Sequence, residues 1–264
     1  MISILPNKSS SDNNVDVSGA CVGCQSNEPF EIEFEYAYQP IVNFSTRSIV
    51  AYEALVRGPN GESAASILAQ INDHNRYRFD QLCRMKAVEG AAKLGMTEFL
   101  SINFLPNAVY RPEVCIRTTL EAARKYNFPV EKIIFEVTEG ERVQDRPHLV
   151  HIIREYRNFG FQTAIDDFGA GYAGLNLLSE YQPDFVKIDM DLVRGVDHHL
   201  PRQAIVEGIT SICKKLNIKV LAEGIETRAE RDFLFASGIE LMQGYWFSKP
   251  VFKGLANIDP SAWE

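Results

Sequence analysis

The sequence has no long apolar segment and no excess of positive charge. Its 264 residues include 27 Lys or Arg and 35 Asp or Glu, which gives a net charge of -8 at pH 7. No uncharged apolar run approaches the roughly 20 residues that a membrane span needs, and no secretory signal is visible at the N-terminus. Duplex nucleic acids and membrane surfaces favour a basic partner. We therefore expect a cytoplasmic protein that binds neither a DNA or RNA polymer nor a membrane.

Cysteine is scarce, and its spacing fits no disulfide framework. The five cysteines are an odd, scattered set, which suits a reducing compartment. Cys21 and Cys24 have the spacing of a metal or redox site, but a tetrahedral zinc site needs two more ligands, and the neighbouring sequence does not offer them. We expect a short turn, or half of a site that another chain completes. The remaining cysteines are Cys83, Cys115 and Cys213.

Residues 1–30 differ from the rest of the chain. They are rich in Ser, Asn and Asp and lack periodicity, which predicts a flexible leader. From residue 31 to residue 264, short apolar runs alternate with segments that carry apolar residues at helical spacing. Strands are expected at 36–44, 48–56, 99–104, 132–138, 162–165, 185–188, 219–222 and 241–247. Helices are expected at 63–72, 79–94, 118–126, 146–159, after 173, and at 203–216 and 228–237.

Strands that alternate with helices indicate βαβ units and a parallel sheet. About eight strands in roughly 220 residues favour a closed barrel over an open sheet. The first two strands are joined by a short turn and are therefore expected to be antiparallel. The predicted fold class is α/β, a modified TIM (β/α)8 barrel with an antiparallel first strand. The alternative is an open doubly wound sheet. Such sheets often carry a GxGxxG fingerprint, which this sequence lacks.

Polar residues stand at or near the carboxyl end of almost every predicted strand. In a β/α barrel these ends converge on one mouth, where such folds place their chemistry. Taken singly, each residue also fits a helix cap, a satisfied polar group inside the barrel or a salt bridge at the rim. The five histidines fall in predicted helices or loops instead. The strand-end residues are Glu53, Arg57, Asn103, Glu136, Glu139, Asp166, Asp167, Lys187, Asp189, Glu223, Glu226 and Gln243.

The chemistry of this set points to hard cations. Oxygen ligands without His or Cys suit Mg²⁺ or Mn²⁺ better than zinc. Asp166 and Asp167 are adjacent like charges at a strand end, which repel each other unless a cation lies between them. Several carboxylates, one of them shared between two ions, form the layout of a two-metal site that hydrolyses phosphate esters. A lysine such as Lys187 would stabilise the charge of the transition state, and a glutamate would accept the proton.

Eight motifs also carry a resemblance to a known family. In chain order they are YQPIV (38–42), EALVR (53–57), SINF (101–104), FEVTE (135–139), DDFGAGY (166–172), VKID (186–189), AEGIE (222–226) and MQGYWFSKP (242–250). The chain resembles the EAL-domain family of bacterial cyclic di-GMP phosphodiesterases over nearly its whole folded length. The resemblance implies a modified TIM barrel that hydrolyses cyclic di-GMP to linear pGpG with two Mg²⁺ or Mn²⁺ ions and takes part in second-messenger signalling.

The resemblance also implies a role for each matching residue. Glu53, Asn103, Glu136 and Asp166 would ligate the first metal, and Asp166, Asp167 and Glu223 the second. Glu223 would be the general base, and Lys187 would contact the nucleophilic water and the scissile phosphate. Glu139 would anchor the loop at 168–176, which couples the site to a homodimer interface in the family. The substrate-binding residues would be Gln39, Leu55, Arg57, Asp189 and Gln243.

Two other classes of function are compatible with this sequence. One is a cyclic di-GMP receptor or interaction module that keeps the fold without turnover; such losses usually remove ligands, and none is missing here. The other is a metal-dependent hydrolase of a different phosphodiester. Binding without hydrolysis would identify the first, and a comparison of dinucleotide substrates would identify the second.

Overall fold

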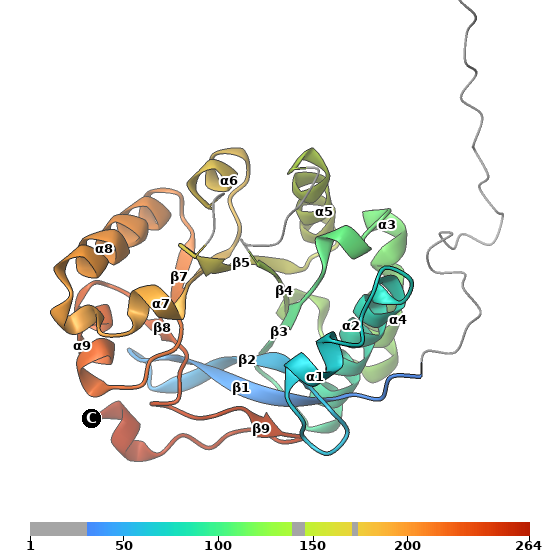
Figure 1. The fold of residues 1–264 in the computed structure, drawn as a ribbon, viewed down its shortest axis with the longest axis horizontal. Helices are drawn as coiled ribbons and strands as arrows, with labels where there is room; N and C mark the ends of the chain where they lie inside the picture. Colours follow the sequence, from blue (N-terminus) through green and yellow to red (C-terminus); the bar gives the residue numbers. More distant parts are fainter. Residues whose placement is uncertain (1–30, 139–145, 171–173) are drawn as a thin grey trace, which may run out of the picture.

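Strands between Glu35 and Met242 form one sheet that closes on itself (Figure 1). The computed structural model describes residues 31–138, 146–170 and 174–264. Within these residues, eight strands form the barrel in the order β2-β3-β4-β5-β6-β7-β8-β1, and β1 also pairs with β2. The strands are β1 (Glu35–Asn43), β2 (Ser48–Arg57), β3 (Phe99–Asn103), β4 (Ile133–Thr138), β5 (Gln162–Phe168), β6 (Phe185–Ile188), β7 (Lys219–Ala222) and β8 (Leu241–Met242).

The directions of the strands confirm the predicted fold class. Neighbouring strands from β2 to β8 are parallel, whereas β1 is antiparallel to both β2 and β8. The barrel is therefore a modified TIM barrel with a reversed first strand. An additional strand that the sequence did not predict, β9 (Val251–Phe252), pairs with β1 outside the barrel.

Helices surround the barrel, as the ribbon in Figure 1 shows. They are α1 (Ala64–Leu68), α2 (Arg76–Lys93), α3 (Pro112–Cys115), α4 (Arg117–Tyr126), α5 (Arg146–Asn158), α6 (Gly174–Glu180), α7 (Met190–Val193), α8 (Leu200–Lys215) and α9 (Arg228–Ala236). None of the helices in the described ranges is long and apolar enough to cross a membrane. The longer predicted helices agree with these bounds to within about three residues, the usual uncertainty at helix ends, whereas α3 and α7 were not predicted.

Two predicted elements are shorter than expected. The helix predicted at 63–72 ends at Leu68, because Asn72 and Asn75 form a side-chain turn instead: the Asn72 N–H donates to Asn75 Oδ1 at 2.8 Å. The strand predicted at 241–247 ends at Met242. At Gly244 the chain crosses so close to the Ile225 backbone that a Cβ would collide with it, and this crossing ends the strand.

Side chains alternate between the two faces of each barrel strand, because successive residues of a strand point to opposite faces. On β4, Phe135 faces outward and packs on Tyr156 of α5 with ring centroids 4.8 Å apart. Its neighbours Ile134 and Glu136 point into the barrel, where Ile134 joins a separate apolar cluster with Ala164 and Phe185. The main core therefore lies between the barrel and the helices, and the inner face is free to carry a site.

A buried ion pair connects α2 to its neighbours. Arg84 and Asp80 lie one helical turn apart, with 2.6 Å between Arg84 Nη2 and Asp80 Oδ2, and both side chains are almost fully buried. Arg84 also donates to the Tyr156 hydroxyl at 3.1 Å, and Asp80 accepts from the backbone N–H of Leu105 at 2.9 Å. The pair thus joins α2 to α5 and to the segment that follows β3.

Replacing one member of this pair should destabilise the protein strongly. Arg84→Met leaves the Asp80 carboxylate buried without its cation, which typically costs about 3–5 kcal/mol of unfolding free energy. Urea unfolding measures this loss. Lys93→Met in the same helix is the matched control, because Lys93 and Glu89 have the same spacing but Lys93 is 67% exposed. It should cost less than about 1 kcal/mol, and equal losses in the two variants would contradict the assignment.

Candidate active site

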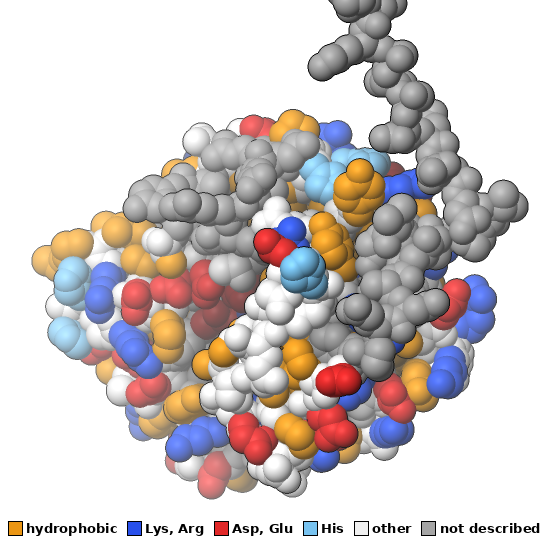
Figure 2. Space-filling view, turned by 45° about the vertical axis from the view of Figure 1, so that its right-hand side comes forward, with side chains coloured by type: hydrophobic (Ala, Val, Ile, Leu, Met, Phe, Trp, Pro, Cys, Tyr) orange, Lys and Arg blue, Asp and Glu red, His pale blue; other side chains and the backbone are white. Residues whose placement is uncertain are grey.

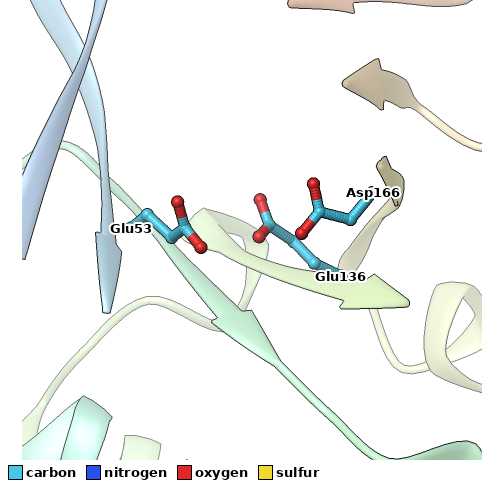
Figure 3. A group of neighbouring side chains, drawn as sticks. All are labelled: Glu53, Glu136 and Asp166. Carbon is cyan, nitrogen blue, oxygen red and sulfur yellow. The ribbon is translucent and has the colours of Figure 1, made fainter. Parts of the chain in front are cut away.

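Three buried carboxylates from three different strands meet inside the barrel. Glu53 comes from β2, Glu136 from β4 and Asp166 from β5, and their side chains point toward one another (Figure 3). One oxygen of each lies within 4.8 Å of the others. Each residue stands near the carboxyl end of its strand, so the parallel register of the sheet places them at one mouth. Figure 2 shows acidic side chains gathered in a recess of the surface on the left of the view.

A second group of carboxylates overlaps the first at Asp166. Oxygens of Asp166, Asp167 and Glu223 also lie within 4.8 Å of one another. In a regular strand, Asp166 and Asp167 would point to opposite faces. The β5–β6 register is shifted between Ile165 and Phe168, and Asp167 has a left-handed backbone with φ +53°. This bulge turns both adjacent carboxylates toward the same mouth.

Lys187 of β6 lies in the centre of the cluster. Its Nζ is 2.6 Å from Glu223 Oε1, 2.9 Å from Glu136 Oε2, 3.0 Å from Asp166 Oδ1 and 3.6 Å from Glu53 Oε2. Burial alone would lower the pKa of Lys187, but the surrounding carboxylates raise the pKa well above its usual value. The lysine is therefore held in its charged form.

One lysine does not neutralise four carboxylates. Burial raises the pKa of Glu136 to about 8; Lys187 opposes this rise, and the nearby Glu53 and Asp166 add to it. Burial likewise raises the pKa of Glu223 well above its ordinary range, and burial together with Asp166 raises the pKa of Asp167 to about 6. Excess negative charge in a set of oxygen donors fits hard divalent cations, and the two overlapping groups fit two of them.

Two amide side chains hold Glu53 in place. Asn103 donates from Nδ2 to Glu53 Oε1 at 3.0 Å, and Gln243 donates from Nε2 to Glu53 Oε2 at 2.7 Å. The amide oxygen of Asn103 then remains available to a cation. Gln243 Oε1 is buried and accepts no hydrogen bond within the described part of the chain. An unpaired buried acceptor is costly and points to a donor on a bound molecule.

Sequence reasoning missed Ser101, whose buried hydroxyl donates to Glu136 Oε1. A signal was available, since Ser101 precedes Asn103 by two residues and therefore shares its face of β3. The sequence also missed three side chains that line a cavity of about 210 Å³ at this mouth, whereas Glu226, which lines it as well, was predicted. The three are Met190, Arg194 and Tyr245.

The remaining predicted residues lie around this cavity or beside it. Gln39 donates to the Ser248 carbonyl at 3.3 Å, and Asp189 caps α7 by accepting from the Asp191 N–H at 2.8 Å; both line the cavity together with Gln243. Leu55 and Arg57 follow Glu53 on β2, are half-buried and lie outside the lining of this cavity. Glu139 lies outside the described residues, as does the leader with its Cys21–Cys24 pair.

The sequence matches the model of the EAL domain family over residues 27–250. It is 34% identical to the blue light- and temperature-regulated antirepressor BluF of Escherichia coli K12 over 228 residues, which are 86% of this chain and 57% of BluF. It is 32% identical over 225 residues to the protein named "Probable cyclic di-GMP phosphodiesterase PdeG" of the same organism, covering 81% of this chain and 44% of PdeG. The chain thus spans about half the length of these relatives.

Solved structures share the fold. A standalone versatile EAL protein from Vibrio cholerae O395, bound to cyclic di-GMP, superposes with a TM-score of 0.87 and 54% identity and covers 89% of this chain and 100% of that one. Klebsiella pneumoniae BlrP1, in a complex with manganese and cyclic di-GMP, has a TM-score of 0.82 and 34% identity, covering 87% of this chain and 59% of BlrP1. Similar proteins therefore bind this nucleotide, and one of them was solved with a divalent metal.

The charge of the cluster predicts how stability depends on pH when divalent metals are removed. Burial raises the pKa of Glu136 from its ordinary 4.5 to about 8. The folded state therefore holds more protons than the unfolded chain between these values, and the free energy of unfolding falls as pH rises through this window. In EDTA, the melting temperature should fall as the pH rises from 4.5 to about 8.

Glu136→Gln tests the cause, because it removes one repelling charge and keeps the shape. In EDTA at high pH this variant should melt about 2–4 °C above the wild type, equivalent to roughly 1 kcal/mol. Added Mn²⁺ should stabilise the wild type more than the variant, since binding to the folded state adds to stability. A wild type whose melting temperature is insensitive to pH, EDTA and Mn²⁺ would contradict the unbalanced charge.

Proposed function

Because the chain belongs to the EAL domain family, we propose that it is a metal-dependent phosphodiesterase that hydrolyses cyclic di-GMP to linear pGpG. The observation that carries this proposal is the pair of carboxylate groups that share Asp166 and surround Lys187. The substrate class is supported by the cyclic di-GMP bound to the Vibrio and Klebsiella proteins and by the name of PdeG.

Two Mg²⁺ or Mn²⁺ ions fit the donor set of this site. Glu53, Asn103, Glu136 and Asp166 would hold one ion, and Asp166, Asp167 and Glu223 the other. When bound, such ions lower the pKa of a water molecule and neutralise charge on the phosphate. They would also oppose the burial and the carboxylate repulsion that together raise the pKa of Glu136 and Glu223.

The chain's own residues would then stabilise charge on the phosphate and accept the proton of the attacking water. Lys187 keeps its positive charge and lies 2.6 Å from Glu223, so it can stabilise the charge that develops on the scissile phosphate. Glu223 is the least enclosed carboxylate around Lys187, with 16% of its side chain exposed, and it lines the cavity at the mouth. We assign Glu223 the role of general base, because it borders the space that an attacking water would occupy.

Substrate contacts would come from the cavity and its surroundings. The unpaired Oε1 of Gln243 can accept a hydrogen bond from a guanine N–H or a ribose hydroxyl. Gln39 and Asp189 lie in the same lining. Arg57 donates to the Val56 carbonyl at 2.7 Å and would have to swing from β2 to bind a phosphate, with Leu55 beside it.

Several features predicted from the sequence stay predictions. These are the flexible leader at 1–30, the cytoplasmic location, the homodimer and the anchoring of the 168–176 loop by Glu139. A second function is favoured by one observation, the similarity to BluF, which is named an antirepressor and not an enzyme. In that case the chain would bind cyclic di-GMP, or a protein partner, without turnover.

An assay of the purified protein with cyclic di-GMP separates these two functions. We expect pGpG to form with Mg²⁺ or Mn²⁺ and not with EDTA, as resolved by chromatography. Asp166→Ala should abolish turnover, because it removes the ligand common to both carboxylate groups. Tight nucleotide binding without product in the presence of either metal would exclude the enzyme and favour the receptor.

Glu223→Gln tests the general base. If Glu223 accepts the proton, kcat should fall by about 10²–10⁴ while KM changes little. Glu240→Gln is the matched control, since Glu240 is an exposed acid at the opposite end of the barrel. Its kcat should equal that of the wild type. An unchanged kcat in Glu223→Gln would refute this role.

A further inference from the structure

The barrel has a second and larger opening at its other end. A cavity of about 840 Å³ lies where strands β2 to β8 begin, opposite the candidate active site. We call this end the amino mouth. Its volume falls within the roughly 300–1,000 Å³ that is typical of small-molecule sites in proteins. Nothing in the phosphodiesterase reaction uses this space.

The wall of the amino mouth is an apolar layer directly below the carboxylates. On β2 to β8 each of its residues precedes a site residue by two positions, as Phe99 precedes Ser101, whereas on the antiparallel β1 Ile41 follows Gln39 by two. Residues two positions apart on a strand share a face, so the layer lies on the inner face of the barrel. TIM barrels usually fill such layers with large branched side chains, but Ala51 and Ala164 stand here and leave space. The layer consists of Ile41, Ala51, Phe99, Ile134, Ala164, Phe185, Leu221 and Leu241.

The rim of the amino mouth carries charges of both signs, and one of its two acids, Asp184, is paired with a cation. Asp184 accepts from the Thr163 N–H at 2.9 Å and from its hydroxyl at 3.1 Å, and it lies 3.6 Å from Arg157. Glu240 accepts from the side-chain amide of Asn43 at 3.5 Å.

The lysines of the rim are Lys214 and Lys219. Lys219 Nζ lies 5.0 Å from the centre of the Phe185 ring, which is itself part of the apolar wall. Within the described ranges, neither Lys214 nor Lys219 forms an ion pair with a carboxylate. Both side chains belong to exposed residues that line the cavity. Lys214 and Lys219 outnumber Glu240, the one rim carboxylate without an ion pair among the described residues, so the net charge left at the rim is positive, above the apolar wall.

We propose that the amino mouth binds a small amphiphilic anion, an apolar chain that carries one carboxylate, of the class of medium-chain fatty acids. The chain would lie against the half-buried members of the apolar layer, Phe99 and Leu241, and replace water there, which is the main source of affinity for such ligands. The carboxylate would remain at the rim between Lys214 and Lys219. A neutral or cationic head group would gain nothing from these lysines.

Calorimetric titration of the full chain with decanoate tests this site. It is done in EDTA, so that the result does not depend on metal binding or turnover at the other mouth. We expect one saturable site per chain. Decyltrimethylammonium, which has the same chain with a cationic head, should bind at least about tenfold more weakly.

Two variants assign the binding to the amino mouth. Lys214→Glu should weaken decanoate binding by about tenfold, whereas Lys215→Glu, the matched change at the next residue of α8, should leave it unchanged because Lys215 does not line the cavity. Ala164→Leu should abolish binding by filling the space. If that variant fails to fold, the comparison of Lys214→Glu with Lys215→Glu still tests whether decanoate binds at the amino mouth.

Three results would overturn the proposal. The first is the absence of saturable decanoate binding to the wild type. The second is equal affinity for decanoate and decyltrimethylammonium, which would show that the rim does not recognise an anion. The third is an equal effect of Lys214→Glu and Lys215→Glu, which would place the ligand elsewhere.

Discussion

The contact of one buried ammonium with four carboxylates is the interaction on which the site depends. Left alone, Glu53, Glu136, Asp166 and Glu223 would repel one another and separate. They stay together because each lies in, or for Glu223 directly after, a different strand, and the parallel ladders from β2 to β8 fix the distances between the strands. Lys187 offsets part of the charge, and amide and hydroxyl donors hold individual oxygens. The barrel thus holds the four carboxylates closer together than they would lie in solution.

The alternation of side chains along the strands explains why one end of the barrel interior is apolar and the other is charged. On β4 the inward residues are Ile134 and then Glu136, and on β5 they are Ala164 and then Asp166. Moving two residues along each of these strands therefore leads from the apolar layer to the charged layer. Glu136 and Lys187 border the cavity of the amino mouth as well as the carboxylate cluster. Only the thickness of one side-chain layer separates the two mouths.

Much of this arrangement could be predicted from the sequence, because strand ends in a β/α barrel converge. That rule alone brought together Glu53, Asn103, Glu136, Asp166, Lys187 and Glu223. It could not reveal the bulge that turns Asp167 into the mouth, since a bulge depends on the register of β5 against β6. Nor could it show that the chain turns at Gly244, because a close backbone crossing leaves no periodic signal. The volume of the amino mouth depends on how the whole barrel closes around Ala51 and Ala164, which no local pattern contains.

The reversed first strand contributes directly to the site. A parallel β1 would need a crossover of a dozen or more residues to reach β2, whereas an antiparallel β1 needs only the short turn after Asn43. The hairpin pairs Gln39 with Glu53 in register, so the first strand delivers its polar residue beside the carboxylate cluster. Because β1 runs in the opposite direction, its later residues Ile41 and Asn43 descend to the amino mouth. A single reversed strand therefore supplies a side chain to each end of the barrel.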